Sequence, residues 1–219
     1  MGLFWKGIPE NFLPASRQLL GDKAIAIETG TYLGSTSKIL GQCFSSCYSI
    51  ERDPKLAIYA TKRLAKFPNI RILQGSSREL LDNIIPANET PVVFWLDAHF
   101  SAGVTAGSDD PCPLIAELET ILSKRQSDNT IVLIDDARGL TGSNGWPSLG
   151  QVCQHFTNEQ WAVVALDDVI IASGNQNIEN VLFDCWPTSK TRGRERLNKY
   201  TQLLDSSKIL NLISFHLKK

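Results

Sequence analysis

Carboxylates follow several apolar, β-type runs of this 219-residue chain. They are Glu28, Glu51, Asp97, Asp135 and Asp136. A carboxylate accepts hydrogen bonds from hydroxyl and amino groups and can bind a divalent cation, so these positions are suited to holding a polar ligand. Because the carboxyl ends of parallel strands lie at one edge of a sheet, we expect the five side chains to gather there.

The first run, residues 24 to 36, ends on Glu28 and turns at Gly30 and Gly34. Gly30 permits a backbone that a Cβ atom would obstruct, and Gly34 permits a helix to begin close to the sheet. A strand, turn and helix of this kind opens a cofactor crevice in a doubly wound α/β sheet. The same Glu-x-Gly-x-x-x-Gly spacing also fits an ordinary turn, so the interpretation depends on the rest of the chain.

The composition favours one domain that acts on a small molecule. The hydrophobic content of 42% is enough for a real core. There are 22 basic and 23 acidic residues, and the net charge of −1 gives no broad electrostatic footprint for nucleic acid or an anionic membrane. We therefore expect a small-molecule acceptor and neither a nucleic-acid nor a membrane partner, and we leave a homo-oligomer open.

The cysteines and the start of the chain indicate a cytoplasmic protein. Five cysteines are an odd number, and they show no Cys-x-x-Cys spacing, so neither a disulfide framework nor a zinc cluster is indicated. The first residues, Met-Gly-Leu-Phe-Trp-Lys, lack a long apolar signal core, and no run reaches membrane-spanning length.

The chain alternates β-type and helical segments. Strands are expected at 24–28, 47–51, 70–73, 91–97 and 130–136, and helices at 14–20, 35–41, 54–66, 77–84, 111–125 and 148–157. Asp53 is expected to cap the helix that Pro54 begins, and Ser77 to cap the helix that follows the third strand.

Two further β-type runs, 161–166 and 169–172, are linked only by Asp167 and Asp168. This link is too short for a crossover helix, so the two runs must form an antiparallel hairpin. Five parallel units and a closing hairpin differ from the dinucleotide fold with six parallel strands.

We expect a single domain in three parts. They are an N-terminal arm at 1–23, a core at 24–173 and a C-terminal extension at 174–219. The arm either packs on the flank of the sheet or covers a bound substrate. In the extension, 177–189 is uncertain, 190–206 is expected to be a helix, and 209–215 a strand or a helix.

Five motifs in this order carry a family resemblance. They are Glu-Thr-Gly-Thr-Tyr-Leu-Gly-Ser-Thr, Ser-Ile-Glu-Arg-Asp-Pro, Ile-Leu-Gln-Gly-Ser-Ser, Trp-Leu-Asp-Ala-His and Ile-Asp-Asp. They resemble the motifs of class I S-adenosylmethionine methyltransferases, in particular the metal-dependent O-methyltransferases such as catechol O-methyltransferase and the macrocin-type sugar enzymes. The resemblance covers about residues 22 to 173. It implies a doubly wound, Rossmann-like α/β fold with a seven-stranded, mostly parallel sheet and a terminal antiparallel hairpin.

The resemblance also implies S-adenosylmethionine as the methyl donor. Glu28 would lie near its ammonium group, and Glu51 would accept hydrogen bonds from both ribose hydroxyls. The positions implied for the cofactor are Glu28, Gly30, Thr31, Tyr32, Gly34, Ser35, Thr36, Glu51, Arg52, Gly75, Ser76, Ser77, Asp97 and Ala98. The alternatives are a solvated Glu51 and a Ser77 that only caps a helix.

Asp97, Asp135 and Asp136 follow the fourth and fifth expected strands. Three converging carboxylates would repel one another, so a divalent cation is the natural compensation, and oxygen ligands favour Mg²⁺. Such an ion would lower the pKa of an acceptor hydroxyl and orient it. Alternatively, Asp136 only caps a loop and Asp97 binds only the cofactor.

The expected catalytic residues are Asp97 and His99. The catechol enzymes carry a lysine three residues after the first metal aspartate, and this chain has Phe100 there. His99 is the nearest titratable group and could take the proton of the acceptor, or it could be a hydrogen-bond partner or a metal ligand. Arg138 could bind an anionic substrate or neutralise Asp135.

We therefore expect methyl transfer from S-adenosylmethionine to a hydroxyl of a small molecule, assisted by a divalent metal. The alternatives are a metal-dependent oxygenase or hydrolase on the same scaffold and a non-catalytic cofactor-binding protein. The acceptor is not named by the sequence. The aromatic residues Trp95, Phe100, Trp146 and Trp186 either line its pocket or belong to the core.

Overall fold

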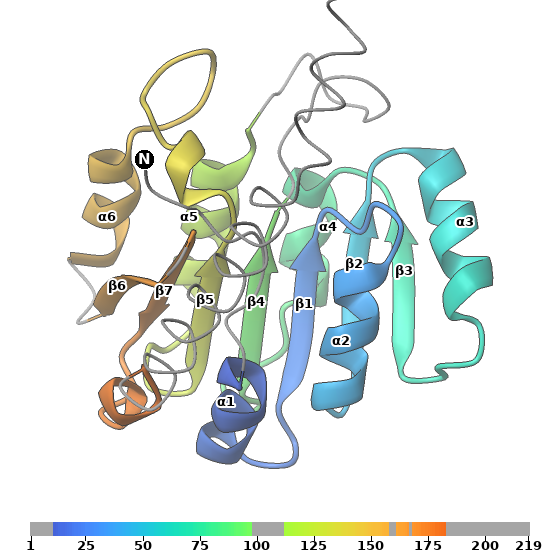
Figure 1. Ribbon diagram of the computed structural model, residues 1–219, viewed down its shortest axis with the longest axis horizontal. Helices are drawn as coiled ribbons and strands as arrows, with labels where there is room; N and C mark the ends of the chain where they lie inside the picture. The colour runs from blue at the N-terminus through green and yellow to red at the C-terminus, as the bar shows by residue number, and fades with distance from the viewer. Residues whose placement is uncertain (1–10, 98–111, 158–160, 167, 183–219) are drawn as a thin grey trace, which may run out of the picture.

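The computed structural model describes residues 11–97, 112–157, 161–166 and 168–182. They form a seven-stranded sheet in the order β3-β2-β1-β4-β5-β7-β6 (Figure 1). The strands are β1 Ile25–Thr29, β2 Cys47–Glu51, β3 Ile70–Gln74, β4 Val92–Leu96, β5 Thr130–Ile134, β6 Ala162–Leu166 and β7 Val169–Ser173.

The sheet is parallel from β3 to β5, and β7 runs antiparallel to both β5 and β6. The predicted hairpin is therefore confirmed, as is the mostly parallel, doubly wound α/β fold. All five residues of β4 and all five of β5 are buried, because helices cover both faces of the sheet at its centre.

The helices agree with the expected segments to within a few residues. They are α1 Phe12–Leu20, α2 Ser35–Cys43, α3 Pro54–Leu64, α4 Ser77–Ile84, α5 Leu114–Lys124 and α6 Leu149–Thr157, with a 3₁₀ turn η1 at Ala137–Gly139. The segments expected at 190–206 and 209–215 lie outside the described residues.

The helices form two layers with the sheet between them. In Figure 1, α2 lies in front of the sheet and α4 and α5 lie behind it. Helices α1 and α2 pack on one face around Ala26 and Val93, and α4, α5 and α6 pack on the other face around Ile27 and Phe94. Helix α3 packs on β2 and β3 at the outer side of the sheet.

One of the two predicted helix caps is confirmed. The Oδ1 atom of Asp53 accepts hydrogen bonds from the backbone N–H groups of Lys55 and Leu56, at 2.7 and 3.0 Å. The prediction for Ser77 is wrong. Ser76 has the extended backbone of the cap position, Ser77 is already helical, and no side chain makes a cap hydrogen bond there. Within the part of the chain that the structure describes, no helix is long and apolar enough to cross a membrane.

Gly34 provides a test of the packing between the glycine turn and α3. Its φ of +76° is left-handed, and a Cβ atom there would lie 2.8 Å from Cδ1 of Leu64. We expect Gly34→Ala to lower the free energy of unfolding by about 2 kcal/mol, because it adds backbone strain to a steric conflict. Urea unfolding measures the change. In the control, Gly150→Ala, the new Cβ meets only Oγ of Ser148 at 3.9 Å. That variant should be unchanged or about 0.5–1 kcal/mol more stable, since alanine favours the helix. Equal losses in both variants would contradict the interpretation.

Candidate active site

The strand order reverses between β1 and β4, which pair with each other in the middle of the sheet. In doubly wound sheets, ligands bind beside the carboxyl ends of the strands at such a reversal. The backbone joins three strand ends there, since the N–H of Asp97 donates to the carbonyl of Thr29 at 3.0 Å and that of Asp135 to Leu96 at 3.1 Å. The acids that follow β4 and β5 are therefore neighbours across the sheet edge.

The glycine turn after β1 is hydrogen-bonded to the end of β2. The N–H groups of Gly30 and Thr31 both donate to the carbonyl of Ile50, at 3.0 and 3.2 Å. The next N–H, that of Tyr32, donates to Oε2 of Glu51 at 2.7 Å. Gly30 and Tyr32 have positive φ angles of 88° and 49°. The first amides of the turn therefore bind protein acceptors, and they position the start of α2.

Glu51 is held rigidly at the end of β2. Its side chain is 7% exposed, so the alternative of a solvated Glu51 is wrong. Besides the bond from Tyr32, its Oε1 accepts a hydrogen bond from the N–H of Asp53 at 2.8 Å. Burial raises the pKa of Glu51, and these two N–H donors act in the opposite direction. A backbone hydrogen bond from Arg52 also lowers this pKa. A carboxylate has about four acceptor positions, so Glu51 can still accept from a hydroxyl donor such as that of a ribose.

Glu28 lies beneath α2 and not at the open edge of the sheet. It is 0% exposed, and Oε2 accepts hydrogen bonds from the hydroxyls of Ser37 on α2 and Ser49 on β2. The hydroxyl of Ser49 is in turn 2.5 Å from that of Thr31 in the glycine turn. A single carboxyl group thus joins β1, β2, α2 and the turn. We interpret Glu28 as a residue that positions the turn.

The surroundings of Glu28 favour its neutral form. Burial raises the pKa of Glu28 from its ordinary value of 4.5 to about 8, although the two serine hydroxyls lower it. Its Oε1 atom has no hydrogen-bond partner among the described residues, and neither has Nε1 of Trp95, the residue paired with Glu28 across β4. Trp95 is 1% exposed, so it belongs to the core and does not line a pocket.

Ser35 and Thr36 occupy the first turn of α2, where backbone N–H groups have no acceptor within the helix. Such a helix start attracts anions, including carboxylates. Arg63 of α3 stabilises the turn that precedes α2. Its Nη1 donates to the carbonyl of Leu33 at 2.5 Å and to Oγ of Ser35 at 3.3 Å. These residues fit the carboxylate end of an amino acid.

The segment after β3 lies next to Glu51. The N–H of Gly75 donates to the Glu51 carbonyl at 2.9 Å, and Gln74 reaches the carbonyl of Arg52 at 3.3 Å. Gly75 has a φ of +153°, and a Cβ atom there would lie 2.7 Å from Cδ1 of Leu80. Gly75, Ser76 and Ser77 thus belong to the same edge as Glu51, as expected for residues beside an adenosine.

Asp136 takes part in the contacts between η1 and the β6–β7 hairpin. Arg138 forms ion pairs with Asp136 and with Asp168, which lies 1% exposed at the β6–β7 turn. The N–H of Arg138 also donates to Oδ1 of Asp168 at 2.9 Å, and that of Ala137 to its carbonyl at 2.9 Å. Arg138 thus has a structural role, and Asp136 occupies the cap position of η1.

The proposed metal ligands are not gathered around one point. Among the described residues, which include Asp97, Asp135 and Asp136, no three His, Cys, Asp or Glu residues are grouped so that they could hold a metal ion. Oδ1 of Asp135 accepts a hydrogen bond from the N–H of Asp136 at 2.8 Å. The residues as placed do not fit a three-aspartate site, and the metal stays a prediction. Ala98, His99 and Phe100 lie outside the described residues, as does Trp186.

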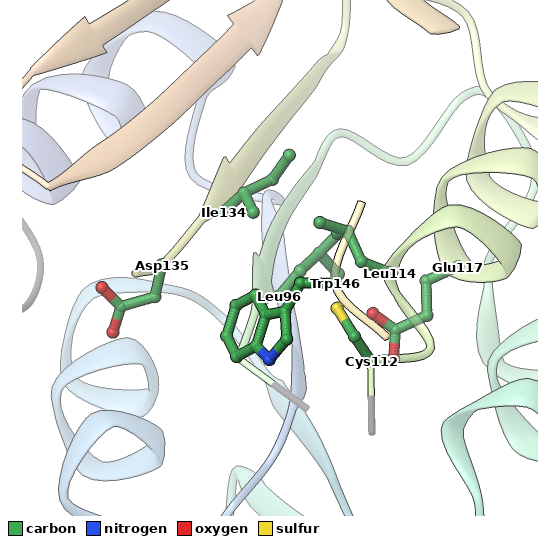
Figure 2. A pocket seen from close by; sticks show the side chains of 7 residues that line it. All are labelled: Leu96, Cys112, Leu114, Glu117, Ile134, Asp135 and Trp146. Atoms are coloured by element: carbon green, nitrogen blue, oxygen red, sulfur yellow. The ribbon is translucent and has the colours of Figure 1, made fainter. Parts of the chain in front are cut away.

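A small recess lies beside the ends of β4 and β5, and Figure 2 shows the side chains that line it. They are Leu96, Cys112, Leu114, Glu117, Ile134, Asp135 and Trp146. The indole of Trp146 lies among them. From the sequence, Trp146 could either line a pocket or belong to the core. The recess has mainly apolar walls, and the carboxylates of Glu117 and Asp135 lie among them.

Glu117 is the site residue that the sequence interpretation missed. It is 1% exposed, and its Oε2 accepts a hydrogen bond from the Thr29 hydroxyl at 3.3 Å. The signal was present, since positions 114, 117, 118 and 121 have the i, i+3, i+4, i+7 spacing of one helix face. An acid on an otherwise apolar, inward face is a candidate for function.

Known proteins resemble this chain in structure, and not in sequence. No family model matches the chain, and no curated protein matches it. An O-methyltransferase from Bacillus cereus in complex with S-adenosylhomocysteine (SAH) is similar in structure, with 16% identity, a TM-score of 0.55, and 74% of this chain and 79% of that chain covered.

Two further solved structures show the same likeness. The SAH-bound methyltransferase of Podospora anserina has 17% identity and a TM-score of 0.51, covering 74% of this chain and 75% of that one. An rRNA methylase from Streptococcus thermophilus has 14% identity and a TM-score of 0.51, covering 76% and 93%. The chain therefore has the class I methyltransferase fold.

The buried carboxyl of Glu28 predicts a pH-dependent stability. The folded chain keeps a proton up to about pH 8 that the unfolded chain releases above 4.5. Between these values, folding loses about 1.4 kcal/mol per pH unit. Glu28→Gln removes this dependence, so its stability relative to wild type should rise with pH across that window and level off outside it.

Urea unfolding of both proteins at about pH 5 and about pH 8 measures this difference. Asp22→Asn, whose parent side chain is 93% exposed, is the control and should follow wild type. Parallel curves for wild type and Glu28→Gln would show that Glu28 is not neutral in the folded chain.

Proposed function

We propose that this protein binds S-adenosylmethionine and transfers its methyl group to a hydroxyl of a small molecule. The observation that carries the proposal is Glu51. It is a buried carboxylate at the end of β2, fixed by the N–H groups of Tyr32 and Asp53 and adjacent to the glycine turn. A residue at this position of a doubly wound sheet is the one expected to accept hydrogen bonds from a ribose.

The cofactor supplies an electrophilic methyl group on a sulfonium sulfur. The chain's own residues bind and orient it. Glu51 accepts from the ribose hydroxyls, the first turn of α2 binds the carboxylate of the methionine part, and Asp97 at the end of β4 accepts from its ammonium group. Glu28 keeps the glycine turn in place through Ser49 and Thr31.

The acceptor side of the proposal rests on the recess at β4 and β5. Leu96, Ile134 and Trp146 give it apolar walls, and Asp135 and Glu117 can accept hydrogen bonds from an acceptor hydroxyl. His99 remains the proposed base for the acceptor proton, because it follows Asp97 by two residues. The fold neighbours act on different acceptors, so the fold alone does not choose between them.

Cofactor binding tests the central residue. We expect SAH to bind wild type saturably in calorimetry and the Kd of Glu51→Ala to rise roughly tenfold to a hundredfold, because hydrogen bonds to a charged group contribute about 1.5–3 kcal/mol. Glu89→Ala, at an exposed position outside this edge, should bind as wild type does. Absence of heat with SAH and with S-adenosylmethionine would overturn the proposal. Binding without transfer to any hydroxyl acceptor would favour a non-catalytic binding protein.

A divalent cation is a separate part of the proposal. Its support is that Asp97 and Asp135 follow neighbouring strands and that Asp135 is bonded through its N–H to Leu96. If this pair binds an ion, chelation by EDTA should reduce the methyl-transfer rate at least tenfold, and added Mg²⁺ should restore it. Asp135→Asn should then lose the Mg²⁺ response, while Asp82→Asn on α4 should retain it. A rate that does not change with EDTA would remove the metal and leave the cofactor site standing.

A further inference from the structure

Helix α3 differs from the other helices in its charges. Its charged residues are Lys55, Lys62 and Arg63, and it contains no acid. The other described helices with more than one charge carry both signs, since α4 has Arg78, Glu79 and Asp82, and α5 has Glu117, Glu119 and Lys124. A solvated helix usually mixes the signs, because pairs of opposite charge stabilise it. Helix α3 lacks that compensation.

The exposed side of α3 carries a regular stripe of Lys55, Tyr59, Lys62 and Lys66, in which Lys66 lies in the turn directly after the helix. The spacing is i, i+4, i+7, i+11, so the four side chains follow one face. All four are exposed, and Tyr59 is 51% exposed. None of the three lysines has an ion-pair partner among the described residues. We call these four residues the α3 stripe.

The charge around the α3 stripe is segregated from the rest of the chain. Residues 52–78 contain seven basic side chains, Arg52, Lys55, Lys62, Arg63, Lys66, Arg71 and Arg78, and a single acid, Asp53. This segment therefore has a net charge of +6, while the rest of the chain has −7. The net charge of −1 for the whole chain therefore does not show that basic residues are concentrated in 52–78. Figure 1 shows α3 and β3 together at that outer edge of the sheet.

Aromatic rings lie near Lys66 of the stripe and near two other cations. Nζ of Lys38 and Nζ of Lys66 lie 5.8 and 5.4 Å from the ring centre of Phe67. Arg71 lies 5.9 Å from the ring of Tyr48, but Tyr48 packs with the core cluster on the α4 face of the sheet, so this pair is not part of the stripe. Within the stripe, the exposed ring is that of Tyr59. Cations that follow a phosphate backbone, with rings on which bases stack, are the combination that binds single-stranded nucleic acid.

We propose that the α3 stripe binds single-stranded RNA. The 11-residue helix is about 16 Å long, which matches the rise of about five stacked nucleotides at roughly 3.4 Å each. A membrane surface fits less well, because an interfacial helix inserts its apolar face. In α3 that face, Ala57, Ala60 and Leu64, is buried in the protein.

The stripe is separate from the recess at the ends of β4 and β5. In the sheet, β3 lies three positions from β4, a separation of about 14 Å at roughly 4.8 Å per strand. The proposal therefore concerns a second surface and does not rest on the identity of the methyl acceptor. Failure of RNA binding would leave SAH binding unaffected.

Fluorescence anisotropy with a labelled oligouridine of about twelve nucleotides tests the proposal on the full chain. We expect saturable binding whose affinity falls as salt rises. Lys55→Gln/Lys62→Gln/Lys66→Gln should weaken binding at least tenfold and reduce the slope of log K against log salt by about 2, since each phosphate contact contributes about 0.7. Tyr59→Leu should weaken binding several-fold without changing the slope, because it removes stacking and no charge.

Lys23→Gln, at an exposed position before β1, is the matched control and should bind RNA as wild type does. Thermal unfolding and SAH binding verify that each variant is folded. The proposal is overturned if wild type gives no anisotropy change at low salt, or if the triple variant keeps the affinity and slope of wild type. It is also overturned if phosphatidylcholine–phosphatidylserine vesicles bind the stripe and oligouridine does not.

Discussion

The buried carboxyl group of Glu28 is the constraint on which the cofactor side of this structure depends. It accepts hydrogen bonds from serines on α2 and β2, and the serine of β2 continues to Thr31 in the glycine turn. A carboxyl group without water is tolerable only where such donors are present or where it keeps its proton. Position and protonation of Glu28 are therefore coupled to the shape of the turn that follows it.

The segment after β5 depends on a second buried acid. Asp168, in the turn between β6 and β7, binds Arg138 through its side chain and Ala137 through its carbonyl. This contact holds the segment after β5 against the hairpin, and Arg138 also pairs with Asp136. The antiparallel hairpin thus does more than complete the sheet, because it decides which of two adjacent aspartates faces the arginine.

The elements of the fold were predictable because their signals are local. The cap formed by Asp53, the apolar runs of β4 and β5 and the short link in the hairpin each follow from a few neighbouring residues. The site was predictable only in part. Glu51 was expected at the end of β2 and is buried there. The helical spacing of Glu117 indicated an inward-facing acid, but its partner, Thr29, is 88 residues away and could not be read from the sequence. The charge balance was limited in a similar way, since the net charge of the whole chain carries no information about how the charges are distributed along it.

By itself, the sequence determined the succession of strands and helices, the antiparallel hairpin and the set of carboxylates at the strand ends. Hydrophobic periodicity and turn chemistry act over a few residues, so they can be interpreted without coordinates. Only the tertiary structure decided what each carboxylate does. It buried Glu28 under α2, fixed Glu51 at the open edge, turned Asp136 to Arg138 and brought Glu117 to the recess. The physical reason is that the desolvation and the hydrogen-bond partners of an acid are set by segments far away in the chain.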